Sequence, residues 1–296
     1  MAASSGPEAA AVGRLRQEVE RLLGTEVTAY RFTPGGWTLA VRGVVTLAGG
    51  QTVFAKLGDP NVPDTINALR DEIATYRLLG ARPFMPRLVA ADAEVPLLIL
   101  EDLSRADRVP PWTARPLDHY RRLCDEMATT PAPEGLRPLA EMVDGDAWER
   151  VTIDPGPAHR ILPAPWLDRN LPALLEAQRQ AHTEGASLVH TDLRSDNLLF
   201  CPDHAIAIDW NLARRGDPRW DPHLTAHTIA MEGGGAPDEL LPDADPSILA
   251  WLAGFFASRA GLPPPAGAPR VRGFQLAQLE VVLPWACRLL GLPTPS

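Results

Sequence analysis

The sequence of 296 residues predicts an α+β chain of two lobes, a small β-rich N-terminal lobe and a larger, mainly helical C-terminal lobe. Three observations favour this division. Short strand-like runs separated by turn residues fill the first part of the chain, the segment after Glu101-Asp102-Leu103 becomes polar and proline-rich, and the rest carries apolar residues mostly at helical spacing. We therefore expect an N-terminal lobe over residues 1–103 and a C-terminal lobe over residues 104–296.

The N-terminal lobe is predicted to contain a helix, an antiparallel sheet and a second helix. Apolar residues recur at helical spacing over residues 7–23, and this pattern ends at Gly24. The period then changes to two, and the predicted strands are residues 28–32, 38–47, 52–57, 86–90 and 97–100. Residues 64–79 are predicted as a helix between the third and the fourth strand. The order β-β-β-α-β-β contains no βαβ repeat.

The C-terminal lobe is predicted to be helical apart from one island of short strands. It follows a polar, proline-rich linker or hinge over Arg105–Pro116. The predicted helices are residues 117–129, 166–183, 222–231, 245–259 and 274–290. The predicted strands of the island are residues 188–190, 197–200 and 205–210, of which the last two form a hairpin.

Charge and cysteine content exclude several classes of protein. The 28 basic and 37 acidic side chains give a net charge of −9, which argues against a nucleic-acid-binding surface and would suit a cationic small-molecule substrate. The three scattered cysteines, Cys124, Cys201 and Cys287, predict neither a disulfide framework nor a zinc site. Without an apolar run of membrane length or a signal peptide, we expect a cytoplasmic protein with no membrane anchor. The oligomeric state is not indicated by the sequence.

Lysine is almost absent from the chain. Of the 28 basic residues, 27 are arginine and only Lys56 is lysine. A sequence rich in Ala, Arg, Pro and Gly indicates a coding bias that replaces lysine by arginine wherever either side chain would serve. Arginine does not serve where a compact ammonium group must fit a tight pocket. Because Lys56 ends an apolar strand-like run, we prefer a functional interpretation to the alternative that one surface lysine remains by chance.

Residues 188–210 contain polar residues between apolar, strand-like runs. Their sequence is LVHTDLRSDNLLFCPDHAIAIDW. It holds His190, Asp192, Asn197 and Asp209 in the pattern His-x-Asp-x4-Asn, then a hairpin, then Asp at the end of an apolar strand. The hairpin is expected to bring Asp209 beside Asn197. A carboxylate next to an amide oxygen is a ligand pair that suits Mg²⁺. Asp192 would then accept the proton of a substrate hydroxyl.

This pattern, with Ile208-Asp209-Trp210 in place of Asp-Phe-Gly, is the layout of the kinase catalytic loop and metal-binding aspartate. It resembles the aminoglycoside phosphotransferase/choline-kinase family of small-molecule kinases, over nearly the whole chain. The resemblance implies a two-lobed, protein-kinase-like fold with the nucleotide between the lobes. It also implies ATP or another nucleoside triphosphate and Mg²⁺ as cofactors, and a small-molecule hydroxyl as acceptor.

The resemblance assigns roles to residues of the N-terminal lobe. Lys56 in TVFAK matches the family lysine that binds α- and β-phosphate oxygens, and Glu72 in the following helix matches its ion-pair partner. A solvated helix face is the alternative for Glu72. Gly35 and Gly36 lie where the family has its phosphate loop, since glycine permits close approach of the backbone to phosphate, although the same residues form ordinary turns.

The hinge is the segment LLILEDL. Its Glu101 and Leu103 match the linker whose backbone groups bind the adenine ring in the family, so their side chains carry little information. Thr191 departs from the family pattern, which commonly has glycine between the histidine and the aspartate of the catalytic loop.

Two further residues of the loop have alternative roles. Arg194 could contact the transferred phosphoryl group, or it could form a salt bridge within the loop. His190 is interpreted as a structural residue that orients the loop.

Two features after the loop are interpreted as structural. Asp221, followed by Pro222, is predicted to cap the next helix. His223 and His227 have the spacing of zinc ligands on a helix, but the Glu of the HExxH motif is absent, so packing is the preferred role.

The sequence therefore predicts an ATP- and Mg²⁺-dependent O-phosphotransferase that acts on a small molecule. Asp192 and Arg194 are the expected catalytic residues, and Asn197 and Asp209 the expected metal ligands. The preferred acceptor is an antibiotic, an aminoglycoside or another natural product, with resistance or self-protection as the role. One alternative is a metabolic kinase of choline, homoserine or a sugar, and another is a non-catalytic nucleotide-binding sensor on the same fold.

Overall fold

The structure is a computed structural model, and it describes residues 6–33, 40–265 and 268–295. The chain forms two compact units. The first unit consists of the residues up to Arg108 together with Asp196–Leu212, and the second consists of Val109–Ser195 and the residues from Ala213 onward. The predicted lobe boundary at residue 103 stays a prediction.

A five-stranded antiparallel sheet forms the centre of the first unit, with the strand order β1-β2-β3-β5-β4. Its strands are β1 (Val27–Phe32), β2 (Val41–Leu47), β3 (Thr52–Leu57), β4 (Leu88–Asp92) and β5 (Leu97–Glu101). The first three are consecutive in both sequence and sheet, which confirms the predicted meander. The expected start of β2 at residue 38 lies outside the described residues.

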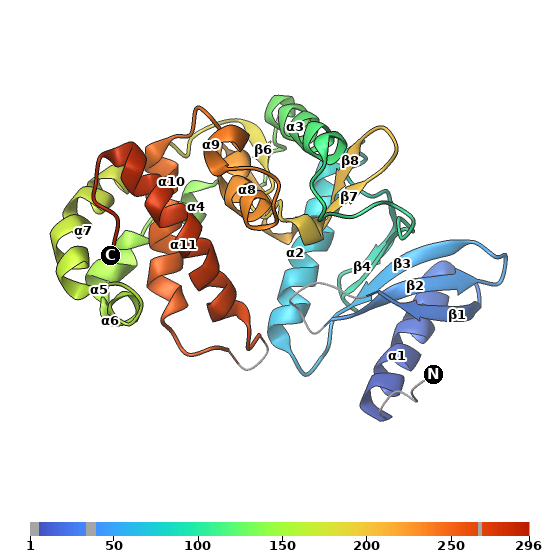
Figure 1. Cartoon of the computed structure of the whole chain (residues 1–296). Coiled ribbons are helices and arrows are strands. Elements are labelled where there is room, and N and C mark those ends of the chain that lie inside the picture. Colours follow the sequence, from blue (N-terminus) through green and yellow to red (C-terminus); the bar gives the residue numbers. More distant parts are fainter. Residues whose placement is uncertain (1–5, 34–39, 266–267, 296) are drawn as a thin grey trace. The chain divides into compact units, whose positions relative to one another are not determined.

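The two faces of the sheet have different coverings because side chains alternate along each strand. The helix α1 (Gly6–Leu23) covers one face, where Leu15 and Val19 pack against Val53, Ala55 and Leu57 of β3 (Figure 1). The intervening residues of β3, Phe54 and Lys56, therefore point to the opposite face. That face carries the pocket described below.

The helix α2 (Pro63–Leu79) begins with proline at its first position and ends at Gly80, whose φ of 62° belongs to the left-handed region. It packs against η2 (Trp210–Leu212), a 3-10 turn of the first unit. Just before η2 lie the hairpin strands β7 (Leu198–Phe200) and β8 (Ala205–Ala207). The predicted hairpin is thereby confirmed, together with the predicted helix over residues 64–79.

The second unit is mainly helical. Its longer helices are α3 (Ala114–Thr129), α7 (Ala164–Arg179), α8 (Trp220–Met231), α10 (Pro246–Ala260) and α11 (Val271–Leu290). The helices α10 and α11 pack side by side and share a core with α7, in which Trp148, Trp251 and Leu283 are buried (Figure 1). All five of these helices were predicted, with ends that differ by a few residues.

Several short elements of the second unit were not predicted. They are α4 (Ala140–Val143), α5 (Trp148–Ile153), α6 (Gly156–His159), α9 (Pro237–Leu240) and β9 (Arg214–Gly216). The strand β9 pairs antiparallel with β6 (Ser187–Val189), the first strand of the predicted island. Helices of four to six residues complete too few turns to produce a periodic pattern. None of the helices in the described ranges has the length and apolar character needed to cross a bilayer.

Candidate functional site

The first unit contains a pocket on the face of the sheet that α1 leaves open. Its lining residues come from β2, β3, α2, β5 and the segment after it, the β7–β8 hairpin with its flanks, and the short segments after β1 and before β4. They are Thr33, Arg42, Val44, Phe54, Lys56, Glu72, Pro86, Leu100, Glu101, Asp102, Leu103, Ser104, Arg108, Asp196, Asn197, Leu199, Ile208 and Asp209. Six predicted site residues, Lys56, Glu72, Glu101, Leu103, Asn197 and Asp209, therefore line the same pocket.

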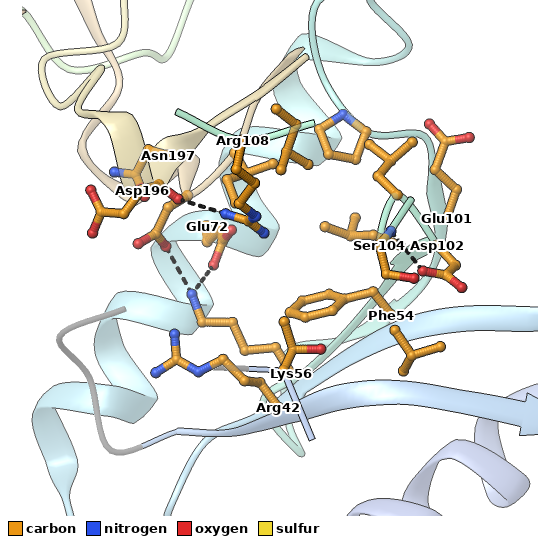
Figure 2. A pocket seen from close by; sticks show the side chains of 18 residues that line it. Arg42, Phe54, Lys56, Glu72, Glu101, Asp102, Ser104, Arg108, Asp196 and Asn197 are labelled. Carbon is orange, nitrogen blue, oxygen red and sulfur yellow. Dashed lines mark hydrogen bonds and ion pairs between the residues drawn. The ribbon is translucent and has the colours of Figure 1, made fainter. Parts of the chain in front are cut away.

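The lining of this pocket is apolar at one end and charged at the other. Across the sheet, Phe54 of β3 is opposite Val44 of β2 and Leu100 of β5, so these three side chains share one end of the pocket. Two residues further along, Lys56 is opposite Arg42. Figure 2 shows Phe54 nearer than Lys56 to Asp102 and Ser104, and Lys56 extended toward Glu72 with Arg42 beside it. Such a lining suits a ligand with an aromatic part and an anionic part.

Lys56 is the centre of a buried ion-pair cluster. Its Nζ donates to Glu72 Oε2 at 2.7 Å and to Asp209 Oδ1 at 2.8 Å (Figure 2). Lys56 is 8 % exposed and Glu72 is 2 % exposed, so the predicted pairing of Glu72 forms in a dry environment rather than on a solvated helix face. Burial alone would lower the pKa of Lys56, but Glu72 and Asp209 outweigh burial and raise it. Burial raises the pKa of Glu72, against the effect of Lys56.

Asp209 is held in an uncommon backbone conformation. Its φ of 69° lies in the left-handed region, which costs about 1–2 kcal/mol for a residue other than glycine. The flanking residues fix the turn, because the backbone N–H of Ile208 donates to Asn197 O at 3.0 Å and the fully buried Trp210 donates through Nε1 to Ala207 O at 2.8 Å. The backbone that carries Asp209 thus lies beside that of Asn197, as the hairpin predicted.

The chemistry of Asn197 and Asp209 fits Mg²⁺. Among the residues that the structure describes, no group of three or more His, Cys, Asp or Glu side chains could hold a metal ion. Magnesium does not require such a group, since it is commonly bound through one or two carboxylates while waters and substrate phosphates complete its shell. An amide oxygen and a carboxylate that line one pocket meet this requirement.

The part of the predicted catalytic loop from His190 to Ser195 belongs to the second unit, and a buried carboxylate holds it. Asp221 accepts the backbone N–H groups of His190 at 2.8 Å and of Thr191 at 2.7 Å. His190 is fully buried and its Nδ1 accepts the backbone N–H of Asp192 at 3.3 Å, which agrees with an orienting role. Thr191 has a φ of 70°. The glycine common in the family would adopt this conformation without strain, and here the two hydrogen bonds to Asp221 help to maintain it.

Asp221 does not cap the helix that follows it, and that prediction was wrong. The helix α8 begins at Trp220, and the Asp221 carboxylate points to the loop thirty and thirty-one residues earlier in the chain. Asp-Pro before a helical pattern is the local signature of a cap, so the sequence alone could not show this long-range partner.

The second unit supplies Asp192 and Arg194, which are paired with each other. Arg194 Nε lies 2.9 Å from Asp192 Oδ1, and both side chains are partly exposed. The salt bridge within the loop, one of the two predicted alternatives for Arg194, is therefore formed. A contact of Arg194 with a phosphoryl group stays a prediction. Gly35 and Gly36 lie outside the described residues, and their role also stays a prediction.

One residue that supports the loop was not found from the sequence. Glu232, at the end of α8, accepts from Ser195 Oγ at 2.5 Å and from Trp112 Nε1 at 2.7 Å. Asp221 of α8 thus holds the loop at His190 and Thr191, and Glu232, directly after α8, holds it at Ser195. No local motif marks Glu232, because both of its partners are distant in the sequence.

The histidines of α8 have packing roles, as preferred from the sequence. His223 Nδ1 lies 2.6 Å from Arg219 O, and His223 Nε2 accepts the backbone N–H of Asp245 at 2.7 Å. His227 contacts Gln278 at 3.0 Å and packs against the ring of Phe256. Burial lowers the pKa of His223 and lowers that of His227 to about 3, so His227 is neutral at physiological pH.

A pH-dependent contribution to stability is expected from Asp221. Burial raises the pKa of Asp221 to about 7, against the opposing effect of its two backbone donors, whereas an unfolded aspartate has a pKa of about 3.9. The folded chain thus binds this proton more tightly, so the contribution is complete below pH ~4 and is lost as the pH rises to about 7. We expect the stability advantage of the wild-type chain over Asp221→Asn to shrink between pH 5 and 7, as measured by urea unfolding. A growing advantage would contradict the raised pKa.

The chain is similar to a known protein family and to several solved structures. The family model described as "Phosphotransferase enzyme family" matches residues 29–255. No curated protein gives a significant sequence match. Among solved structures, the choline kinase LicA from Streptococcus pneumoniae is 14% identical with a TM-score of 0.63, and the alignment covers 95% of this chain and 98% of that one.

Two further solved structures are similar. A choline/ethanolamine kinase family protein from Mesorhizobium loti is 16% identical with a TM-score of 0.66, covering 95% of this chain and 98% of its own. A spectinomycin phosphotransferase, solved with ADP and spectinomycin, is 13% identical with a TM-score of 0.60, covering 91% and 97%. At these identities the likeness concerns the fold, and the predicted α+β, protein-kinase-like fold class is confirmed.

Proposed function

Because this chain belongs to the phosphotransferase enzyme family, we propose that it transfers the terminal phosphoryl group of ATP, or of another nucleoside triphosphate, to a hydroxyl of a small molecule. The observation that carries the proposal is the buried cluster of Lys56, Glu72 and Asp209 in a pocket whose other end is apolar. The apolar end suits a nucleobase, and the ammonium at the opposite end suits a phosphate chain.

In this proposal the residues of the first unit bind the nucleotide. Glu101 and Leu103 present backbone groups to the base, next to the apolar end of the pocket. Lys56 binds phosphate oxygens, and Glu72 fixes the ammonium so that little side-chain entropy is lost when the nucleotide binds. A positive charge held in place before the reaction stabilises charge that develops on the transferred group.

Asn197 and Asp209 would hold Mg²⁺ in the same pocket. When bound, the ion neutralises phosphate charge and supports the phosphates in the orientation for transfer. Lys56 contacts Asp209 in this structure. With the metal bound, the Asp209 carboxylate would interact with both Mg²⁺ and the Lys56 ammonium.

Asp192 is the proposed general base, and Arg194 its proposed catalytic neighbour. Asp192 would accept the proton of the acceptor hydroxyl as the new O–P bond forms, while the bond from the terminal phosphorus to its bridging oxygen breaks and the nucleoside diphosphate leaves. Asp221 and His190 hold the loop backbone on both sides of Thr191, so Asp192 is presented from a fixed segment. Arg194, paired with Asp192 at 2.9 Å, would be available to contact the phosphoryl group.

We propose an antibiotic as the acceptor, an aminoglycoside or another natural product, modified in the cytoplasm for resistance or self-protection. The net charge of −9 favours cationic acceptors. The similar spectinomycin phosphotransferase was solved with ADP and spectinomycin. A metabolic kinase is the second candidate, since two of the similar folds belong to choline or choline/ethanolamine kinases.

The test is a screen in which purified protein, ATP and Mg²⁺ are incubated with separate pools of aminoglycosides, peptide and nucleoside antibiotics, amino alcohols and sugars. We expect a product heavier by one phosphoryl group in an antibiotic pool, detected by mass spectrometry with matching ADP release. A product only in the amino-alcohol or sugar pools would establish the metabolic candidate. Slow ATP hydrolysis with no phosphorylated acceptor would favour a nucleotide sensor and overturn the proposal.

The metal assignment predicts a separable defect in Asp209→Asn. This change keeps an oxygen but removes one negative charge from the proposed metal site, so we expect a higher Mg²⁺ concentration at half-maximal rate. The acceptor KM is expected to change little. A magnesium titration of turnover measures the first effect, and Asp203→Asn, in an exposed turn of the same hairpin, is the matched control. A titration identical to that of the wild type would remove Asp209 from the site.

A further inference from the structure

Arg42 is a second cation at the charged end of the pocket, and it belongs to none of the sequence motifs described above. In the register of β2 and β3, Arg42 is directly opposite Lys56. Residues opposite each other in an antiparallel pair lie on the same face of the sheet. Both side chains accordingly line the pocket, and Figure 2 shows them side by side toward Glu72.

The backbone of Arg42 is fixed by a built contact with β1. The Tyr30 hydroxyl donates to Arg42 O at 2.8 Å. Tyr30 reaches this oxygen across Gly43, where an added Cβ would lie 2.5 Å from the Tyr30 ring and 2.5 Å from Arg31 O. Any larger residue at position 43 would displace the tyrosine or separate the two strands. The backbone from which the Arg42 side chain extends is therefore held in place.

The charges around Arg42 balance at the charged end of the pocket. Glu72 and Asp209 carry two negative charges, and Lys56 and Arg42 carry two positive charges. Burial lowers the pKa of Arg42, while Asp209 and Glu72 oppose that effect. A guanidinium that has lost much of its water and faces a pocket gains from an anion that enters, because charge-assisted hydrogen bonds strengthen as water is excluded.

We propose that Arg42 binds the phosphate chain of the nucleotide, as a second phosphate-binding residue beside Lys56. The inference rests on the proposed function, because it concerns the same pocket. The planar guanidinium provides several N–H donors in one plane and can contact two oxygens at once, whereas the Lys56 ammonium acts as a point charge. Arg42 of β2 and Lys56 of β3 thus bind the phosphate chain from two adjacent strands.

The test compares ligands that share the nucleoside and differ in phosphate. Binding of AMP-PNP, ADP and adenosine is measured by isothermal titration calorimetry at one Mg²⁺ concentration, for wild type and Arg42→Met. Loss of a hydrogen bond to a charged group predicts a Kd about 10- to 100-fold higher for AMP-PNP and a raised Kd for ADP. Adenosine is expected to bind with an unchanged Kd. Arg42→Lys keeps the positive charge but lacks the planar set of N–H donors. It should restore part of the AMP-PNP affinity relative to Arg42→Met.

Two further variants, one a control and one a milder test, separate phosphate binding from a structural role of Arg42. Arg77→Met removes an exposed arginine of α2 in the same unit, and it should change none of the three affinities. Tyr30→Phe keeps the ring over Gly43 but removes the hydrogen bond to Arg42 O, so we expect a smaller loss confined to the phosphorylated ligands.

Each outcome is decisive. An equal loss for AMP-PNP, ADP and adenosine in Arg42→Met, or no loss for any of them, overturns the role of Arg42. A wild-type chain that binds no nucleotide overturns the proposed function itself, independently of Arg42. A loss that is confined to the phosphorylated ligands and is partly restored by lysine supports the proposal.

Discussion

Replacement of Asp192 by alanine is expected to lower turnover by about 10²- to 10⁴-fold, the usual contribution of a general base. Nucleotide affinity should stay within a few-fold of wild type, because the residues proposed to bind the nucleotide lie in the other unit. The change also removes the partner of Arg194. Both side chains are partly exposed, so the stability loss should be at most about 1 kcal/mol.

The measurement is kcat with the best acceptor from the screen, together with the Kd of AMP-PNP and the midpoint of thermal unfolding. Asp203→Ala makes the same chemical change in an exposed turn and should leave all three unchanged. Turnover of Asp192→Ala at the wild-type level would exclude Asp192 as the base. A collapse of thermal stability would show that the loop salt bridge is a main contribution of Asp192 to the fold.

Lys56→Arg should lower turnover by about 10²-fold, although it conserves the charge. The ammonium lies within hydrogen-bond distance of both Glu72 and Asp209 and is nearly inaccessible to water. The bulkier, planar guanidinium cannot occupy the same point, and a small displacement of the reacting group can cost this much in rate. Overpacking of a buried site should also cost about 1–3 kcal/mol of stability.

Steady-state kinetics at low and saturating ATP measure the effect of Lys56→Arg, and the Kd of AMP-PNP identifies a binding defect. The reverse exchange at an exposed position of the same unit, Arg77→Lys, is the control and should be silent. Wild-type turnover of Lys56→Arg at low ATP would defeat the proposed phosphate contact. It would also defeat the argument that the only lysine of the chain persists because arginine cannot replace it.

Elements with a clear period were predicted well. The limits of β3 at residues 52 and 57 agree with the prediction, and the limits of α2 differ by one residue, because alternation and helical spacing are local signals. The pairing of Lys56 with Glu72 could be predicted because both residues match an ion pair of the family that the sequence resembles. The structure then shows its environment, a buried cluster to which Asp209 also belongs.

Residues whose roles depend on distant partners could not be predicted. Arg42 enters the pocket because of the register between β2 and β3, and register follows from packing rather than from the residue itself. Asp221 and Glu232 bind groups about thirty residues away or more, and neither has a local motif for that contact. The short helices α4, α5, α6 and α9 lie in segments that are too brief to show a period.

The division of the first unit into two stretches of sequence has a consequence for biosynthesis. The ribosome must add residues 109–212 after Arg108 before that unit is complete, which takes on the order of 5–20 s at ~5–20 residues per second. During this interval the apolar side chains of Phe54 and Leu100 are present without Leu199 and Ile208, which line the same pocket in the complete unit. The nascent chain therefore carries an uncovered apolar surface, and this surface is where we expect a chaperone to bind before the hairpin arrives.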